Sequence, residues 1–437
     1  MELQRKLNTT ALTMIGIGAS IGSGIFVTPA DTIALLPHYG WAILPWLLGG
    51  LAAYCGGLTF AELGASRPKA GGVYIYLKEA YGPLAGFLYG WCVLLIINTG
   101  ALAALGLAFA DYMTFFIRLS PAESQGLAIA VIAGLSGINC LGVSYSDKLS
   151  RTFTGLKLLA MVAIIAAGCY AFADQPALMT QGWQTPTPTN LTGAISGAFI
   201  GVFWSIGGWH HISYVSGEAV NPGRDVPRAL LYSVAIITLV YICIILAYMA
   251  ILPMDQIIGS KRIAGDAIAH LFNGGGRLVA VFIAISIFGT IAIYTMSAPR
   301  IYYAMAKDGV FFPSVGKVHP IFNTPANAII VQAVWAIVLV LAYGSFMKVI
   351  AFVTFMDILF MSLAAATIFI FRSRHGVPSV FSVKAYPLLP MVYLLISSTF
   401  VVYTLLDLNE GAIAGMVILA IGILAYYYFR KKYLTEA

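Results

Sequence analysis

The chain has 437 residues, of which 60% are hydrophobic and only 9% are charged. An ordinary soluble domain is roughly 25% charged, so this chain carries too few charges to cover a water-facing surface, and we expect lipid to solvate most of it. The formal net charge of +7 does not indicate a nucleic-acid-binding protein, because no cluster of Lys and Arg with interleaved aromatic residues occurs in the sequence.

Twelve apolar segments are each long enough to cross a bilayer, which requires about 20 residues. The loops between them are short, so the whole chain, 1–437, is predicted to form a single transmembrane domain. The third and eighth segments are the longest, which predicts tilt or extension beyond the bilayer. The predicted spans are residues 11–36, 41–65, 81–117, 125–145, 149–173, 191–216, 226–252, 275–305, 325–344, 347–371, 386–406 and 411–430.

The distribution of Lys and Arg predicts the orientation of these spans. Basic residues are far more frequent in the loops on the side of the N-terminus, and the C-terminal tail adds more of them after residue 429. Since cytoplasmic loops carry the excess of positive charge, we expect a multi-pass protein of the cell membrane with both termini in the cytoplasm.

A polar stretch, residues 174–190, divides the first ten spans into two sets of five. The first span of each set has a glycine-rich centre. Because five spans invert the topology of the next five, residues 11–173 and 191–371 are predicted to be inverted repeats related by an axis in the membrane plane. Residues 386–430 would then add two further helices.

The glycine-rich centres, residues 16–26 and 203–209, are poor helix formers. Unwound backbone in a membrane is tolerated only where it lines a cavity or is buried in protein. We therefore predict that the first and sixth helices are broken, which would leave amide groups free to attract a carboxylate and carbonyl groups free to attract an ammonium ion. The alternative is that the small residues only allow close helix packing.

Three motifs resemble one family of membrane proteins. Residues 22–29 resemble the first-helix signature of the amino acid–polyamine–organocation superfamily, and are most similar to its L-type amino-acid transporters. Residues 61–74 are similar to the family's second span and first inner loop, and residues 217–227 to the segment after its sixth helix. The resemblance implies an all-α membrane fold with twelve transmembrane helices, a LeuT-like 5+5 inverted repeat and broken helices 1 and 6. It also implies exchange of neutral amino acids by alternating access.

The resemblance further implies a role for individual residues at the two breaks. Gly22, Ser23 and Gly24 would face the substrate carboxylate. Backbone carbonyls of the first and sixth helices would face its ammonium group, and the ring of Trp204 would gate the site. The predicted substrate-binding residues are Ser20, Gly22, Ser23, Gly24, Trp204, Ser205, Gly207, His210 and Asp357, and the carbonyls are those of Ser20, Trp204 and Gly207.

Lys157 lies about two turns into the fifth predicted span. A lysine at this depth is costly unless it is paired or faces a cavity. The resemblance places its ammonium group where sodium-coupled relatives bind a cation, which predicts transport that does not require sodium. The alternative is that the side chain extends to the cytoplasmic interface.

Two further intramembrane residues, His210 and Asp357, are functional candidates because ionisable groups are rare in membrane spans. We expect them to tune side-chain selectivity or to bind a proton, unless they form a buried structural pair. His211 would point about 100° away from His210 on a helix, so only one of the two is expected to face the site. Glu62, Glu218 and Arg300 lie near the inner loops and are predicted to form a cytoplasmic gate network.

Other functions remain as alternatives to exchange. A proton-coupled amino-acid symporter and a transport-inactive amino-acid sensor both fit the same residues. An enzyme is not expected, because no catalytic or metal-binding motif occurs, and we predict no cofactor and no metal. The expected partners are an amino-acid substrate and the lipid bilayer. No glycoprotein heavy subunit is expected, because residues 118–125, the outer loop where the family has its linking cysteine, contain none.

Overall fold

The computed structural model describes residues 4–343, 346–378, 380–406 and 410–433, and within these ranges it is helical and contains no β-strand. One isolated parallel bridge joins Leu7 to Ala219. The composition accounts for this architecture, because a helix satisfies its backbone hydrogen bonds within one segment, as lipid surroundings require. The prediction of an all-α fold is confirmed.

Eight helices or helix pairs of the described chain are long and apolar enough to cross a membrane, with lengths between 19 and 33 residues. Two of them are composite, because a π-helical segment or a proline interrupts the regular hydrogen bonding. They are α3 (Tyr39–Ser66), α5 with η2 and α6 (Pro83–Cys92, Val93–Ile97 and Asn98–Met113), α8 (Val143–Asp174), α12 (Pro222–Ile251), α15 with α16 (Gly275–Ser297 and Pro299–Lys307), α18 (Phe346–His375), α19 (Leu388–Leu406) and α20 (Glu410–Tyr433).

Four shorter or less apolar helices overlap the remaining predicted spans. They are α1 (Thr9–Ser20), α7 (Pro121–Cys140), α10 (Leu191–Ile206) and α17 (Ala326–Tyr343). Each of the twelve predicted ranges therefore coincides with a helix or an interrupted helix.

The start of α7 lies before the boundary predicted from hydropathy. Ser120 accepts a hydrogen bond from the amide of Glu123, and the Glu123 carboxylate accepts one from the amide of Ser120 in return. This capping box, followed by Pro121 in the first turn, starts the helix outside the apolar segment. Hydropathy alone cannot place such a boundary, because the capping residues are polar.

Both predicted helix interruptions are present. The first helix ends at Ser20, and the chain continues through non-helical residues 21–23 to a 3₁₀ turn, η1 (Gly24–Phe26), and then α2 (Thr28–Leu35). The sixth ends at Ile206 and resumes as the short α11 (His211–Tyr214). The two breaks therefore occur at the glycine-rich centres of their segments.

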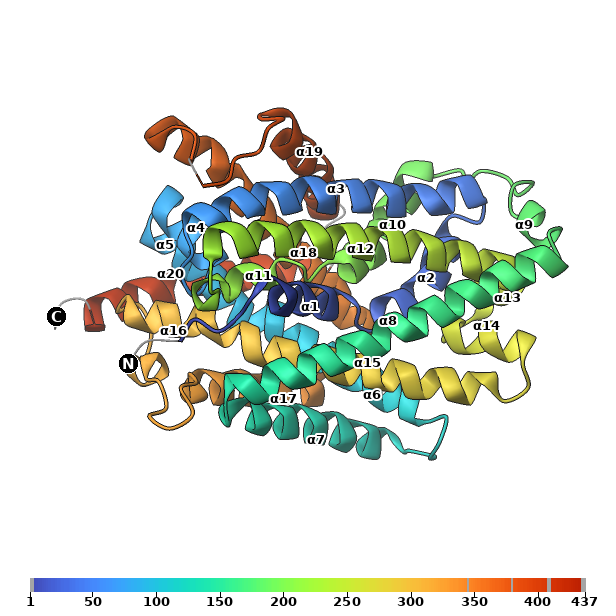
Figure 1. Ribbon diagram of the computed structural model, residues 1–437, viewed down its shortest axis with the longest axis horizontal. Helices are drawn as coiled ribbons and strands as arrows, with labels where there is room; N and C mark the ends of the chain where they lie inside the picture. The colour runs from blue at the N-terminus through green and yellow to red at the C-terminus, as the bar shows by residue number, and fades with distance from the viewer. Residues whose placement is uncertain (1–3, 344–345, 379, 407–409, 434–437) are drawn as a thin grey trace.

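The α1 helix lies inside the bundle, where α8, α12 and α15 pack against it (Figure 1). Nearly all its residues from Ala11 to Ser20 are buried, so a displacement of the end of α1 would shift the three helices packed against it.

The remaining short elements connect the long helices. They are α4 (Val73–Tyr81), α9 (Leu178–Gln181), η3 (Ser216–Glu218), α13 (Met254–Gly259), α14 (Ile263–Leu271) and η4 (Pro313–Gly316).

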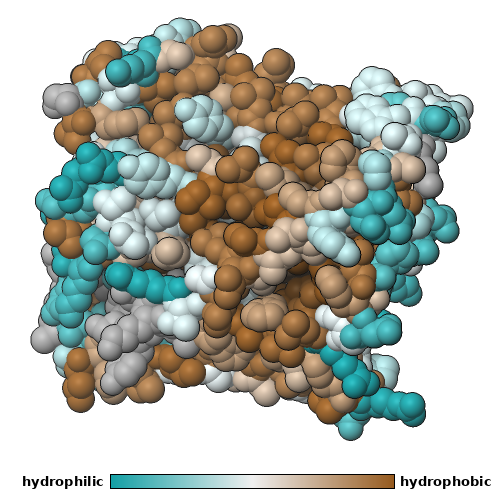
Figure 2. Space-filling model, turned by 45° about the vertical axis from the view of Figure 1, so that its right-hand side comes forward, coloured by the Kyte–Doolittle hydropathy of each residue, from teal (hydrophilic) through white to brown (hydrophobic). Residues whose placement is uncertain are grey.

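The two ends of the bundle differ in what they carry. The chain before α1 and the end of α20 lie at the same end, at the left of Figure 1, whereas α9, α13 and α14 lie at the opposite end. Figure 2 shows hydrophobic residues over the middle of one face and hydrophilic residues toward its left and right margins. A bilayer-spanning bundle has such a belt, because its apolar middle faces lipid tails and its ends face water.

Candidate functional site at the two helix breaks

The two interrupted helices touch each other through glycines. Gly208 has a φ of +100°, which side-chain-bearing residues rarely adopt, and a Cβ atom there would lie 2.7 Å from the carbonyl carbon of Ala19. Gly24 is equally close to α10, since a Cβ atom at that position would lie 2.8 Å from the Cα atom of Ser205. The sequence predicted both breaks, and the structure adds that they are in direct contact.

Tyr241 of α12 lies between the two helix ends. Its hydroxyl is 2.9 Å from the carbonyl oxygen of Ser20 and 3.1 Å from that of Ser205, and the side chain is buried. A hydroxyl has one proton, so it donates to one of these carbonyls at a time. Sequence reasoning missed this residue, because a tyrosine in an apolar helix carries no signal of its partners.

Backbone amides after the end of α1 have no acceptor. The amides of Ser23, Gly24 and Ile25 donate no hydrogen bond to the described chain. The side-chain oxygens of Ser20 and Ser23 are buried there and also lack a partner in the described ranges. Because buried donors are almost always paired, this group of amides is suited to hold an anion.

The carbonyl groups at the breaks differ in whether they are free to accept a hydrogen bond from a ligand. The carbonyl of Ser20 lies within reach of Tyr241 and also accepts a hydrogen bond from the amide of Gly22 at 2.9 Å, so both of its lone pairs have protein donors. The carbonyl of Gly207 accepts no hydrogen bond from the part of the chain that the structure describes. Of these two predicted ammonium ligands, Gly207 is therefore the one left open.

Lys157 of α8 ends at the first break. Its Nζ atom donates to the carbonyls of Gly18 and Ile21, each at 2.8 Å. It also donates to the hydroxyl of Thr290 on α15 at 2.5 Å, and the residue is 1% exposed. The three bonds use all three ammonium protons. The side chain therefore points into the break, as the resemblance implies, and not along its helix toward an interface.

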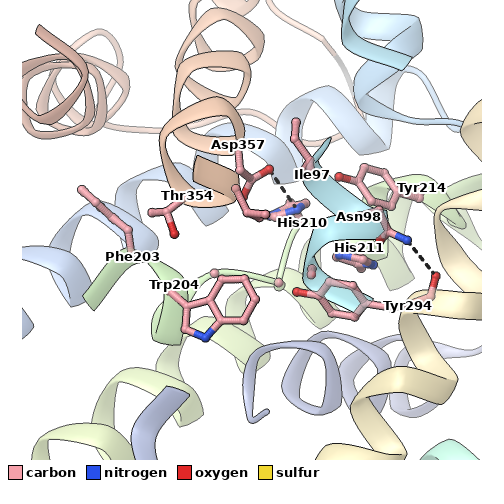
Figure 3. A pocket seen from close by; sticks show the side chains of 14 residues that line it. Ile97, Asn98, Phe203, Trp204, His210, His211, Tyr214, Tyr294, Thr354 and Asp357 are labelled. Atoms are coloured by element: carbon pink, nitrogen blue, oxygen red, sulfur yellow. Dashed lines mark hydrogen bonds and ion pairs between the residues drawn. The ribbon is translucent and has the colours of Figure 1, made fainter. Parts of the chain in front are cut away.

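A small cavity of about 30 Å³ lies beside the second break. Four predicted binding residues line it, namely Trp204, Gly207, His210 and Asp357 (Figure 3). The other predicted binding residues, Ser20, Gly22, Ser23, Gly24 and Ser205, are buried at the first break and at its contact with α10, outside this lining. The rest of the lining is Ile97, Asn98, Ala101, Phe203, Gly208, His211, Tyr214, Tyr294, Val353 and Thr354.

His210 and Asp357 face each other in this cavity, with His210 Nε2 3.7 Å from Asp357 Oδ1 (Figure 3). His211 lines the cavity as well, and its Nδ1 is 2.6 Å from the hydroxyl of Ser297. The expectation that only one of the two histidines faces the site is wrong. His210 is the N-cap of α11 and has helical dihedral angles, and the two rings lie only 5.1 Å apart, so a rotation of about 100° does not take His211 out of the cavity.

Two residues of the lining were missed for different reasons. Thr354 precedes Asp357 by one turn of α18, so spacing on one helix face could have identified it. Asn98 begins α6 directly after the π-helical segment, which changes the face that it presents and is not visible in the sequence. Within the described ranges, no group of three or more His, Cys, Asp or Glu residues could hold a metal ion.

The three predicted gate residues form two separate ion pairs. Arg300 donates two hydrogen bonds to the Glu218 carboxylate, at 2.7 and 3.2 Å, and both side chains are at most 2% exposed. Glu62 instead pairs with Arg372, at 2.8 and 2.5 Å, and accepts a third bond from the amide of Val383. The predicted network thus lacks Arg372, which only the folding of α18 against α3 brings to Glu62.

Replacing Arg300 with glutamine is expected to lower the thermal stability of the purified protein markedly. Removing one partner of a buried ion pair leaves an uncompensated charge and costs about 3–5 kcal/mol. Lys69, which pairs with Glu79 and has a side chain 64% exposed, provides the control, because an exposed pair contributes roughly 0–1 kcal/mol. Equal shifts in the unfolding temperature of Arg300→Gln and Lys69→Gln would contradict the expectation.

Comparison with known proteins places these observations in a family. A family model described as amino acid permease matches residues 7–427. The serine/threonine exchanger SteT of Bacillus subtilis (strain 168) is 33% identical over 427 residues, which cover 97% of this chain and 95% of that protein. Asc-type amino acid transporter 1 of Mus musculus is 28% identical over 446 residues, covering 99% and 83%. Large neutral amino acids transporter small subunit 2 of Homo sapiens is 28% identical over 438 residues, covering 98% and 81%.

Proposed function

This chain belongs to the amino acid permease family of multi-pass membrane proteins, within the amino acid–polyamine–organocation superfamily, and from that premise we propose that it is a sodium-independent exchanger of neutral amino acids. The observation that carries the proposal is the first helix break, where amides without an acceptor in the described chain follow directly on carbonyls that bind the Lys157 ammonium. It works by alternating access across the cell membrane.

The amides of Ser23, Gly24 and Ile25 bind the substrate carboxylate. The carbonyl of Gly207 binds the ammonium group from the second break. All α-amino acids carry this carboxylate and this ammonium group. The backbone at the two breaks therefore recognises an α-amino acid, and the cavity recognises its side chain. No Lys or Arg lines the cavity in the described chain, which disfavours an acidic side chain.

Lys157 takes the place of a coupling cation. Its charge is fixed to the protein and held by Gly18, Ile21 and Thr290, so the first break has its positive charge without sodium. Sodium independence follows, because no bound cation has to enter or leave in the cycle.

The cavity supports alternating access through its size. About 30 Å³ holds only two or three water-sized groups, so a whole amino acid enters only when the site opens. The Glu218–Arg300 and Glu62–Arg372 pairs form the cytoplasmic gate. Both chain ends lie at the same end of the bundle (Figure 1), which supports an even number of spans. The proposed arrangement is twelve spans in a 5+5 inverted repeat, with both termini cytoplasmic.

Proton-coupled symport is the second candidate, and the His210–Asp357 contact at 3.7 Å favours it because either side chain can carry a proton. A transport-inactive sensor would have the same site and no net or exchange flux. In all three cases the chain acts without a glycoprotein partner, so the purified single chain is the correct material for the test.

The test is counterflow in liposomes that contain only this chain. Uptake of a labelled mixture of neutral amino acids is expected to require unlabelled amino acids inside. Replacing external sodium with choline should leave the rate unchanged, because Lys157 supplies the charge. Uptake driven by an imposed pH gradient into empty liposomes would establish symport instead. Binding without any flux would establish the sensor.

A further inference from the structure

Three side-chain oxygens around the cavity, two acceptors and one hydroxyl, have no hydrogen-bond partner in the described chain. They are Oδ1 of Asn98, Oγ1 of Thr354 and Oδ1 of Asp357. Asn98 and Thr354 are at most 3% exposed. Buried polar atoms are paired in the great majority of cases, so three unpaired atoms lining one small space indicate that a bound molecule supplies their hydrogen-bond partners.

The identity of each unpaired atom follows from its neighbours. The Asn98 Nδ2 atom donates to the carbonyl of Tyr294 at 3.4 Å (Figure 3), which leaves Oδ1 as the free acceptor. Asp357 Oδ1 is 3.7 Å from His210 Nε2, which is too long for a hydrogen bond. Buried threonines in helices commonly donate a hydrogen bond to a backbone carbonyl one turn earlier. The Thr354 hydroxyl makes no such bond.

The size of the cavity limits the side chain that can bring those hydrogen-bond partners. Each water-sized group needs at least about 10–15 Å³, so about 30 Å³ admits two or three non-hydrogen atoms. In this closed form the long side chains of lysine and arginine do not fit. A carboxylate would face the acceptors of Asn98 and Asp357, and a short apolar side chain would leave all three atoms unpaired at a cost in affinity.

We propose that Asn98, Thr354 and Asp357 form a subsite that recognises the side-chain hydroxyl of a small amino acid, so that the preferred substrates carry a β-hydroxyl group. The inference rests on the proposed function and names the substrate class of its site. The hydroxyl donates its proton to one of the acceptors at a time, and its oxygen accepts from the Thr354 hydroxyl or from His210.

Threonine and valine provide a matched pair of ligands, because they differ only by a hydroxyl in place of a methyl group. Competition for binding to the purified protein is expected to favour threonine by about tenfold to a hundredfold, since leaving buried acceptors unpaired has a penalty of this size. The near-isosteric Thr354→Val and Asp357→Asn variants should each reduce that preference at least threefold, mainly by weakening threonine. Equal affinity of the wild-type protein for threonine and valine would overturn the subsite.

Thr367→Val is the control for these variants. Thr367 is buried on the same helix, bonds to the carbonyl of Ala364 and does not line the cavity, so its loss should leave the preference unchanged. A preference unchanged in both Thr354→Val and Asp357→Asn would also overturn the proposal. Failure to bind any neutral amino acid would instead overturn the proposed function, so the two failures are distinguishable.

Discussion

Replacing Gly24 with alanine is expected to weaken amino-acid binding about tenfold or more in a protein that still folds. The added Cβ atom would lie 2.8 Å from the backbone Cα of Ser205, and backbone cannot yield as the end of a flexible side chain can. Overpacking of this kind costs about 1–3 kcal/mol. The strain would push the first break away from α10 and displace the amides of Ser23, Gly24 and Ile25 that bind the substrate carboxylate.

The sequence suggests a different reason for a loss of binding at Gly24, namely that a bulky side chain would occupy the carboxylate position itself. Gly22→Ala is the matched control, because it makes the same change in the same break. There the nearest atoms are side-chain carbons of Leu105 and Thr290, at 3.2 and 3.4 Å, which can move. Binding isotherms of both variants measure the loss of amino-acid affinity, and gel filtration checks that each variant is folded. If Gly24→Ala binds amino acids with wild-type affinity, the first break is not part of the binding site.

Replacing Lys157 with methionine is expected to reduce exchange more than tenfold. Methionine keeps an unbranched chain of similar length, so packing is preserved and only the charge and its donors are lost. Hydrogen bonds to charged groups contribute about 1.5–3 kcal/mol each, and Lys157 makes three. Thr290 contacts the same two carbonyls at 2.9 and 3.0 Å, but its single proton cannot satisfy both.

The initial rate of counterflow in liposomes measures this loss, with Lys317→Met as the control, because Lys317 is exposed and distant in sequence from both breaks. A rate in Lys157→Met equal to that of the control would mean that the ammonium group is dispensable. The proposed substitution for a coupling cation would then fail, although the amino-acid site at the breaks would stand.

The helices, the two breaks and the place of Lys157 could all be predicted from the sequence. Hydropathy finds membrane helices because lipid forces every backbone group to bond within its own segment. Glycine-rich centres mark breaks because helix propensity is a local property. Lys157 could be placed because the motifs of the first helix align this chain with a family, and its contacts with Gly18 and Ile21 agree with that placement.

The same reasoning failed where a residue's role depends on another helix. Arg372 reaches Glu62 from α18, and Tyr241 reaches the ends of both broken helices from α12. His211 lines the cavity beside His210, where helices α6, α15 and α18 meet the second break.

The sequence by itself determined that the chain lies in lipid, where its helices run, and that two of them break at mid-segment. The tertiary structure alone decided that Asn98 and Thr354 join Asp357 at the cavity, and which carbonyls remain open for a ligand. The physical reason is that hydropathy and propensity act over neighbouring residues, whereas a buried polar atom is paired or unpaired according to what distant helices pack against it.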